Sequence, residues 1–190
     1  MKYKLKKHKG LLIVLAVLIV LAALIITKYN KLATLDNDVD AAYSQVQIVV
    51  KRRADLIPNL VNVVKGYASH EEDTFLKVTE ARSGIANSKN ITELSKANNE
   101  LSNAISKLNL VVERYPDLKA NENFLDLQAQ LEGTENRISA ERGRYNDTVK
   151  EYNKVVRSFP MNIFAKMFGF EKKAYFEINK SDEQVPEVNF

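Results

Sequence analysis

His70 is the only histidine outside the first ten residues, and its neighbours suggest metal or acid–base chemistry. His70 and Glu71 begin like the His-Glu-x-x-His motif of zinc proteases, but Thr74 stands where the second imidazole is needed. A site with one imidazole and several carboxylates could hold a metal ion in principle. However, the acidic run Glu71, Glu72, Asp73 is also typical of the first turn of a helix, where negative charge is favourable. We therefore expect His70 to pack against or cap a helix start, and we expect no metal and no cofactor.

Nucleophilic catalysis has little support in the sequence. The chain contains no cysteine, which removes thiolate nucleophiles, disulfides and thiolate metal ligands together. Its serines lie in no G-x-S-x-G motif, and there is no glycine-rich phosphate loop. Carboxylates one helical turn apart, Asp36 with Asp40 and Glu132 with Glu135, are typical of solvated helix surface, and a slender helical protein offers no concave glycosidase site. These observations favour a protein that is not an enzyme.

The segment Arg53-x-Asp55 places a guanidinium at a core position. Apolar residues recur around it at spacings of three and four, and Arg53 takes one of the inward-facing positions. A buried guanidinium is costly unless carboxylates or carbonyls accept its hydrogen bonds. We predict a structural ion pair between Arg53 and either Glu135 or Glu141. The alternative is a ligand-binding arginine in a site shared with Asp55 and His70.

Two Tyr-Asn pairs, Tyr145-Asn146 and Tyr152-Asn153, lie seven residues apart. Both tyrosines share a helix face with Phe159, which predicts core packing with the hydroxyls reaching the rim. The alternative is that the rings and the asparagine amides line a groove and bind a peptide or a partner helix.

The elements that position these residues begin with sixteen apolar residues, Leu11 to Ile26, which follow five lysines. Residues 10–28 approach the roughly 20 residues needed to cross a bilayer, so we predict a transmembrane helix after a basic N-terminus at residues 1–9. A secretory signal peptide is the alternative, but no small-x-small cleavage site follows the apolar run. The excess of lysine before the span predicts a cytoplasmic N-terminus and an extracytoplasmic remainder in the cell membrane.

The basic character of the chain comes from this N-terminal region. The first 31 residues contain seven lysines and no acidic side chain, whereas the remainder has 24 acidic side chains against 21 basic ones. A mildly acidic remainder without a basic stripe argues against nucleic acid as a partner.

Helical periodicity dominates from Asn30 onward, and residues 29–178 are predicted to form one domain. The fold expected is all-α: the transmembrane helix is followed by an antiparallel four-helix bundle with long helices. The first helix should continue from the span with little or no break to about Ala68, and Pro58 should kink it near Ala54. Residues 179–190 are predicted to be an extended polar tail.

Turn and cap signals divide the remaining helices. A capping box at Ser69-x-x-Glu72 predicts a second helix over about 70–88, and Thr92 is expected to begin a third that ends before Pro116. A fourth should run over about 121–159, with a short helix closed by Gly169 after it.

Several segments resemble the LemA family. They are Arg53-x-Asp55-Leu56-Ile57-Pro58-Asn59-Leu60, then Glu113-x-Tyr115-Pro116-Asp117-Leu118, then Tyr145-Asn146 and Tyr152-Asn153 ahead of Phe159-Pro160. The resemblance extends from about residue 29 to 178. It implies a single-pass bacterial membrane protein with a helical bundle domain and no established biochemical activity.

Together these observations predict a membrane-anchored, non-enzymatic interaction or scaffold module of the bacterial envelope. Its expected partners are the lipid bilayer through residues 10–28, another membrane or envelope protein or peptide, and further copies of itself. The alternative is a ligand-binding or hydrolytic protein. The candidate structural or interaction residues are Arg53, Asp55, Pro58, His70, Tyr145, Asn146, Tyr152 and Asn153.

Overall fold

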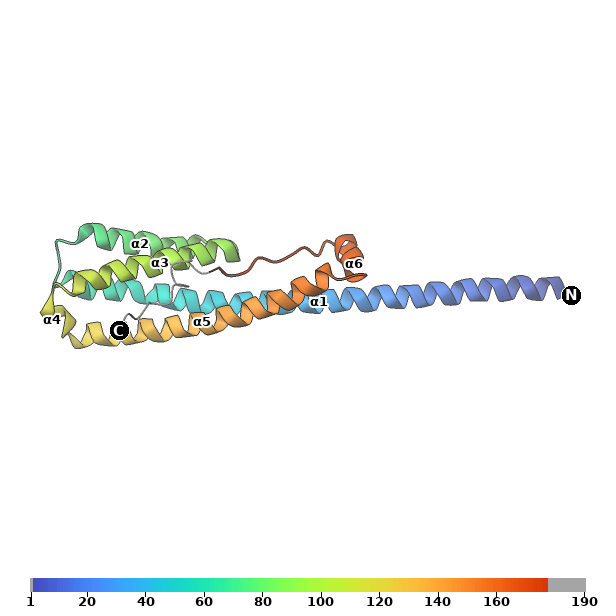
Figure 1. Ribbon diagram of the computed structural model, residues 1–190, viewed down its shortest axis with the longest axis horizontal. Coiled ribbons are helices and arrows are strands. Elements are labelled where there is room, and N and C mark those ends of the chain that lie inside the picture. The colour runs from blue at the N-terminus through green and yellow to red at the C-terminus, as the bar shows by residue number, and fades with distance from the viewer. Residues whose placement is uncertain (1, 178–190) are drawn as a thin grey trace, which may run out of the picture. The chain divides into compact units, whose positions relative to one another are not determined.

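The computed structural model describes residues 2–177, with side chains from residue 11 onward. Within that part it contains six helices and no strand (Figure 1). The helices are α1 (Lys2–Lys65), α2 (Glu72–Asn87), α3 (Ile91–Val112), α4 (Pro116–Lys119), α5 (Glu122–Arg157) and α6 (Met161–Phe168). The predicted all-α fold with a long apolar N-terminal helix is confirmed. The tail expected at residues 179–190 lies outside the described residues.

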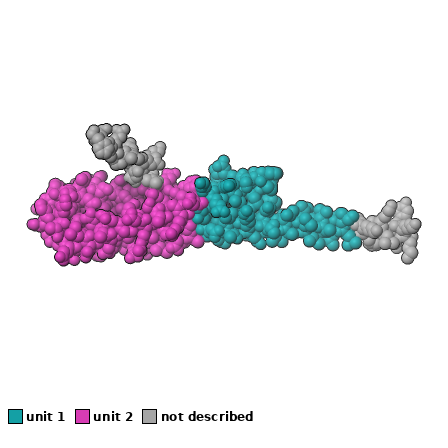
Figure 2. Space-filling view, turned by 60° about the horizontal axis from the view of Figure 1, so that its bottom comes forward, with its two compact units in different colours: residues 1–40, 148–173 teal, residues 41–147, 174–190 magenta. Residues whose placement is uncertain are grey.

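The chain divides into two compact units (Figure 2). Unit 1 comprises residues 1–40 and 148–173, and unit 2 comprises residues 41–147 and 174–190. Unit 1 therefore holds the apolar part of α1, the end of α5 and all of α6. Unit 2 holds the rest of α1, then α2, α3, α4 and most of α5.

Helix α1 runs from Lys2 to Lys65 without interruption, so the expected continuity between the apolar run and the next helix is confirmed. Every side chain from Leu11 to Ile26 is exposed. In the described part of the chain, α1 is the one helix long and apolar enough to cross a membrane. An unbroken helix satisfies its own backbone hydrogen bonds, which is what the hydrocarbon of a bilayer demands.

In unit 2, α1, α2, α3 and α5 run lengthwise in alternating directions (Figure 1). Each contributes fully buried aliphatic side chains, among them Val50, Val78, Leu108 and Ile138. Burying such a side chain stabilises the fold by roughly 1.5–3 kcal/mol relative to leaving it exposed. Alternating direction and a shared apolar core are what an antiparallel four-helix bundle requires.

The start of α2 differs from the prediction. The helix begins at Glu72, and Glu71 precedes it without a side-chain capping hydrogen bond, so the capping box at Ser69 is wrong. His70 lies exposed in the turn before the helix, and Glu71 takes the cap position. The Glu71 carboxylate instead accepts a 2.7 Å hydrogen bond from Arg114 Nη2 just after α3. The side chain of Glu71, the residue at the cap position, therefore pairs with Arg114 and does not cap α2.

Helix α3 has a strong cap that the sequence prediction placed slightly too late. Asn90 Oδ1 accepts a hydrogen bond from the Glu93 N–H at 2.9 Å, and a Glu93 carboxylate oxygen accepts one from the Lys89 N–H at 2.8 Å. This reciprocal arrangement satisfies backbone N–H groups that the helix itself leaves free. The helix accordingly begins at Ile91, immediately after Asn90.

The predicted inward face of Tyr145 and Tyr152 is confirmed, and it extends along α5 at seven-residue spacing, but it does not include Phe159. The buried members are Phe124, Leu131, Ile138, Tyr145 and Tyr152. Phe159, in contrast, is 81% exposed, because α5 ends at Arg157 and Phe159 no longer lies on its inner face. Gly169 ends α6 as predicted, in the left-handed conformation (φ 77°) that favours glycine.

Pro58 lies inside α1, and the helix continues through it. Proline has no N–H, so the carbonyl of Ala54, one turn earlier, loses its intrahelical donor. Arg82 of α2 supplies the missing bond, because its Nε donates to the Ala54 oxygen at 3.1 Å. The proline thus creates a free acceptor that ties α2 to α1.

We predict that Arg82→Met lowers the free energy of unfolding by about 1–2 kcal/mol, since a buried carbonyl loses its donor. In a Pro58→Ala background the same change should cost less, because residue 58 then donates to Ala54 within the helix. Urea unfolding of the full chain in detergent, followed by far-UV circular dichroism, measures the four-variant cycle. An equal loss in both backgrounds would show that the two features are independent.

Candidate functional site

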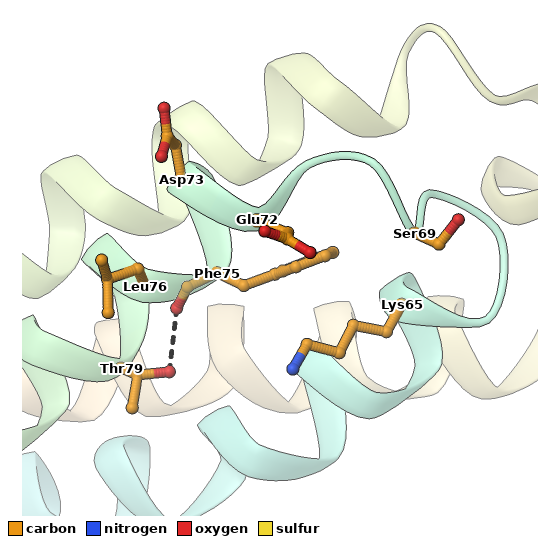
Figure 3. Close-up of a pocket in the computed structure, with 7 residues that line it drawn as sticks. All are labelled: Lys65, Ser69, Glu72, Asp73, Phe75, Leu76 and Thr79. Atoms are coloured by element: carbon orange, nitrogen blue, oxygen red, sulfur yellow. Dashed lines mark hydrogen bonds between the residues drawn. The ribbon is translucent and has the colours of Figure 1, made fainter.

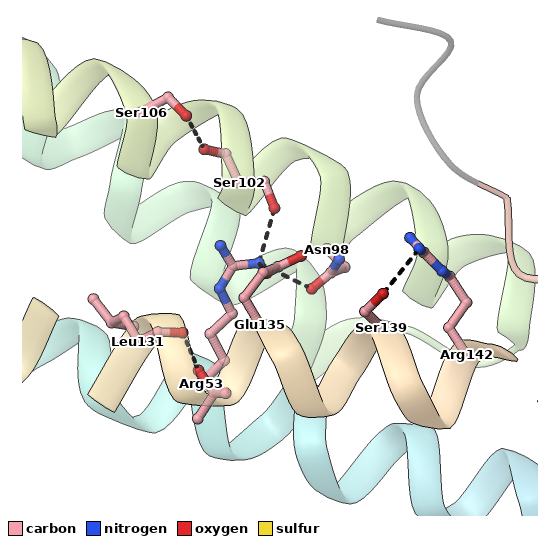
Figure 4. A network of polar contacts seen from close by, with 9 residues as sticks. Arg53, Asn98, Ser102, Ser106, Leu131, Glu135, Ser139 and Arg142 are labelled. Atoms are coloured by element: carbon pink, nitrogen blue, oxygen red, sulfur yellow. Dashed lines mark hydrogen bonds and ion pairs between the residues drawn. The ribbon is translucent and has the colours of Figure 1, made fainter. Parts of the chain in front are cut away.

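A buried polar network in unit 2 surrounds Arg53, which is 5% exposed (Figure 4). Arg53 Nη1 lies 2.6 Å from Glu135 Oε2 of α5. The same nitrogen donates to Ser102 Oγ of α3 at 2.8 Å and, more weakly, to Asn98 Oδ1 at 3.4 Å. The predicted ion pair is therefore present with Glu135, whereas Glu141 pairs with Arg144 along α5. Arg53 joins α1 to both α3 and α5.

The electrostatics of this network are not fully compensated. Burial lowers the pKa of the Arg53 guanidinium, and the negative charge of Glu135 opposes that shift. A guanidinium stays charged at neutral pH even so. Arg53 Nε and Glu135 Oε2 are both buried and make no hydrogen bond within the described residues, so the 2.6 Å approach is a charge contact without hydrogen-bond alignment. The guanidinium keeps one donor unused.

A cavity of about 300 Å³ borders this network, lined also by Leu60, Ser106, Phe124 and Gln128. The volume is at the lower end of the range for small-molecule sites. Asp55 lies outside it and lines a separate cavity of about 360 Å³ beside Arg82. His70 is exposed in the turn before α2. The structure thus places the three residues of the alternative ligand site in three different surroundings.

In unit 2 the first Tyr-Asn pair holds the segment that follows α6. Asn146 Nδ2 donates to the Phe176 carbonyl at 3.1 Å, and Asn146 Oδ1 accepts from the Phe176 N–H at 2.9 Å. Tyr145 is buried and its hydroxyl donates to the Ala174 carbonyl at 2.8 Å. The asparagine amide thus pairs with an extended backbone as a neighbouring β-strand would.

In unit 1 the second pair, Tyr152-Asn153, binds the backbone of Lys173 in the same way. Asn153 Nδ2 donates to the Lys173 carbonyl at 2.9 Å, and Asn153 Oδ1 accepts from the Lys173 N–H at 3.0 Å. The Tyr152 ring packs in the core, as predicted, but its hydroxyl is also buried and does not reach the rim. The Lys173 ammonium lies 5.8 Å from the ring centroid. Both tyrosines therefore pack in the core, and each asparagine amide binds extended backbone of the chain itself.

Lys173 also forms an ion cluster in unit 1 that the sequence prediction missed. Its Nζ lies 2.9 Å from Asp36 Oδ1 and 3.6 Å from Asp40 Oδ1. Burial alone lowers the pKa of Lys173, but the two carboxylates outweigh it and raise the pKa above the usual value. Burial, followed by the charges of Asp36 and Asp40, raises the pKa of Tyr152 well above its usual range. Asp36, expected to be solvated surface, is instead partly buried against Lys173, whereas Asp40 stays exposed as expected.

A cavity of about 620 Å³ in unit 2 lies where α1 ends and α2 begins (Figure 3). Phe75 and Leu76 supply its apolar surface, and Lys65, Glu72 and Asp73 supply charges of both signs. The Lys65 ammonium lies 5.4 Å from the Phe75 ring centroid. Within the described part of the chain, no group of three or more His, Cys, Asp or Glu side chains is arranged to hold a metal ion. The cavity thus combines an apolar centre with charges of both signs.

An apolar helix that continues into a helical bundle defines a class of membrane-associated helical protein. Residues 42–190 match the LemA family, and the chain belongs to that family. Magnetosome protein MamQ 2 of Paramagnetospirillum magneticum is 27% identical over 194 residues, covering 87% of this chain and 71% of that protein. Magnetosome protein MamQ of Magnetospirillum gryphiswaldense is 25% identical over 178 residues, covering 80% and 65%. Protein LemA of Metamycoplasma hominis is 27% identical over 163 residues, covering 84% and 74%.

We predict that Glu135→Ala lowers the free energy of unfolding by about 1–3 kcal/mol, because Arg53 is left buried without its counter-charge. The loss is smaller than for a fully buried pair, since Glu135 is half exposed and solvent screens it. Adding Arg53→Met should recover part of the loss, and thermal unfolding of the variants measures both effects. Glu132→Ala, an exposed neighbour on the same helix, is the control. If the double variant loses the sum of the two single losses, the pair is not coupled.

We predict that Asn146→Ala speeds hydrogen exchange of the Phe176 amide, and that Asn153→Ala speeds exchange of the Lys173 amide. Each substitution removes two hydrogen bonds, which corresponds to roughly tenfold faster exchange or more. Asn136→Ala, an exposed asparagine on the same helix, should leave both amides unchanged. Unaltered protection in the first two variants would mean that other contacts hold the segment.

Proposed function

We propose that this chain is a membrane-anchored, non-enzymatic interaction module of the bacterial envelope. The observation that carries the proposal is that the two parts of α1 lie in different surroundings. Its first part exposes apolar side chains from Leu11 to Ile26, whereas its later part buries Val50 and Leu60 in the core of unit 2. A helix whose beginning suits lipid and whose end belongs to a protein core tethers that core to the membrane.

The proposed orientation follows from the lysines. Five of them precede the apolar run, whereas Lys28 and Lys31 alone follow it closely before Asp36. Positive charge is retained on the cytoplasmic side, so the N-terminus is cytoplasmic and the helical units are extracytoplasmic.

The proposed docking surface is the cavity between the end of α1 and the start of α2. Leu76 is 58% exposed there, beside the buried Phe75 ring, and Lys65 and Asp73 lie at the rim. An apolar centre with polar surroundings is the usual anatomy of a protein interface. The side-chain amides of Asn146 and Asn153 already bind the backbone of Phe176 and Lys173. They are not available to a separate peptide, so the cavity is the better surface for a protein or peptide partner.

The relatives support interaction over a single dedicated reaction. Proteins named for the magnetosome and a protein named LemA match more than three quarters of this chain at similar identity. Similarity both to proteins named for the magnetosome and to a protein named LemA suits a module that recognises different partners.

A small-ligand site at Arg53 is the second candidate. The observation in its favour is the unpartnered, buried Arg53 Nε beside a cavity of about 300 Å³. A free guanidinium donor would suit a carboxylate or phosphate group. The substitution Arg53→Met distinguishes the two functions. If the role is interaction, the variant still contacts its partner at Leu76; if the role is ligand binding, the variant loses the ligand.

We predict that a single cysteine at Leu76 reports both orientation and partner, since the chain has no cysteine of its own. A membrane-impermeant thiol reagent should label Leu76→Cys in intact cells. A photo-crosslinker attached to that cysteine should capture one defined protein species.

Leu110→Cys is the matched control, because Leu110 is 71% exposed on α3 and lines none of the cavities described above. It should be labelled equally and should not capture the same species. Labelling only after lysis refutes the orientation. Equal capture at both positions, or capture at neither, refutes docking at the cavity.

A further inference from the structure

We propose that α6, together with Phe159 just before it, is a second membrane contact that lies in the headgroup region of the bilayer. The inference rests on the proposed membrane anchoring and adds a surface that touches the lipid beside the spanning segment. The occupant is the phospholipid surface itself, with its headgroups and the first part of its acyl chains.

Aromatic contacts in unit 1 place α6 next to the end of the apolar run. The Tyr29 ring centroid lies 5.1 Å from that of Phe168 and 5.9 Å from that of Phe170. Tyr29 follows Ile26 by three residues, which is about 4.5 Å along a helix. This is the depth at which tyrosine rings gather at the boundary between lipid and water.

Helix α6 leaves part of its apolar surface uncovered. Met161 and Ala165 are buried on one side of the helix. Ile163 and Met167, one turn apart on another side, are each 57% exposed, and Phe159 is more exposed still. Asn162 and Lys166 form a separate polar strip, also one turn apart. The helix therefore has two apolar strips. Met161 and Ala165 pack against the protein, whereas Ile163 and Met167 form an open strip that remains exposed.

Continuity and charge indicate lipid as the occupant of the open strip. The strip lies on the helix that contacts Tyr29, at the end of sixteen exposed apolar residues that already suit hydrocarbon. Lys28 and Lys31 of α1 closely follow the apolar run and α6 carries Lys166, and lysines beside an apolar face favour anionic headgroups.

The direction of α6 agrees with this placement. In Figure 1 the apolar part of α1 lies along the picture, whereas α6 is seen nearly end-on, so α6 crosses α1 instead of running beside it. A helix that lies in the plane of the interface must cross a spanning helix in this way.

Tryptophan fluorescence tests the inference directly, because the chain contains no tryptophan. The full chain carrying Ile163→Trp is reconstituted into vesicles of brominated phosphatidylcholine and phosphatidylglycerol. We expect its emission to shift to shorter wavelength and to lose intensity relative to vesicles without bromine. Met167→Trp, on the same open strip, should behave alike and provides a second probe if the first variant folds poorly.

Three controls separate the possible failures. Asn162→Trp, on the polar strip of α6, should be quenched less, and Leu110→Trp, exposed on α3, should not be quenched. Leu18→Trp lies within the apolar run and should be quenched strongly if that run enters the bilayer. Quenching at Leu18 without quenching at Ile163 and Met167 overturns the lipid contact of α6 but leaves the anchor in place. No quenching at Leu18 overturns the anchor, and the inference with it.

Discussion

The constraint on which the structure depends is the continuity of α1. One helix carries an apolar run that no part of the described chain covers and then supplies core residues to unit 2. Pro58 interrupts its backbone hydrogen bonding at Ala54, and Arg82 of α2 supplies the replacement donor. The place where α1 lacks a backbone hydrogen bond is therefore also a place where α2 is attached to it.

Polar side chains in both units hold segments in register where apolar packing alone would leave them free to slide. In unit 2, Arg53 reaches Glu135 and Ser102 on two other helices, and Asn146 holds Phe176 by two hydrogen bonds. In unit 1, Asn153 holds Lys173 in the same manner. Such contacts add little net stability each, but they are satisfied in one register only.

This arrangement suits a protein that presents a surface. Most groups of these polar networks pair with other parts of the chain, and within the described residues the buried atoms without a hydrogen bond are Arg53 Nε, Glu135 Oε2 and the Tyr152 hydroxyl. Apolar surface is left open in three of the places described above, which are the run in α1, the outer strip of α6 and the Phe75–Leu76 cavity. Exposed apolar surface of this kind marks contact with lipid or with another protein.

The sequence alone determined which side chains face inward. Spacing at three, four and seven residues correctly predicted the burial of Arg53, Tyr145 and Tyr152. The need of a buried guanidinium for a carboxylate led to two candidate partners for Arg53, of which Glu135 is the one found. Periodicity succeeds here because burial is a property of a helix face. It failed at Phe159, where the face ends with the helix at Arg157.

Only the tertiary structure decided which distant segments meet. Nothing local to Asn153 or Asp36 indicates Lys173, and nothing near Ala54 indicates Arg82. An extended segment has no helical period, and an amide or carboxylate accepts any donor that packing brings within reach. These pairings are fixed by the path of the chain through space, which a one-dimensional pattern of apolar residues does not contain.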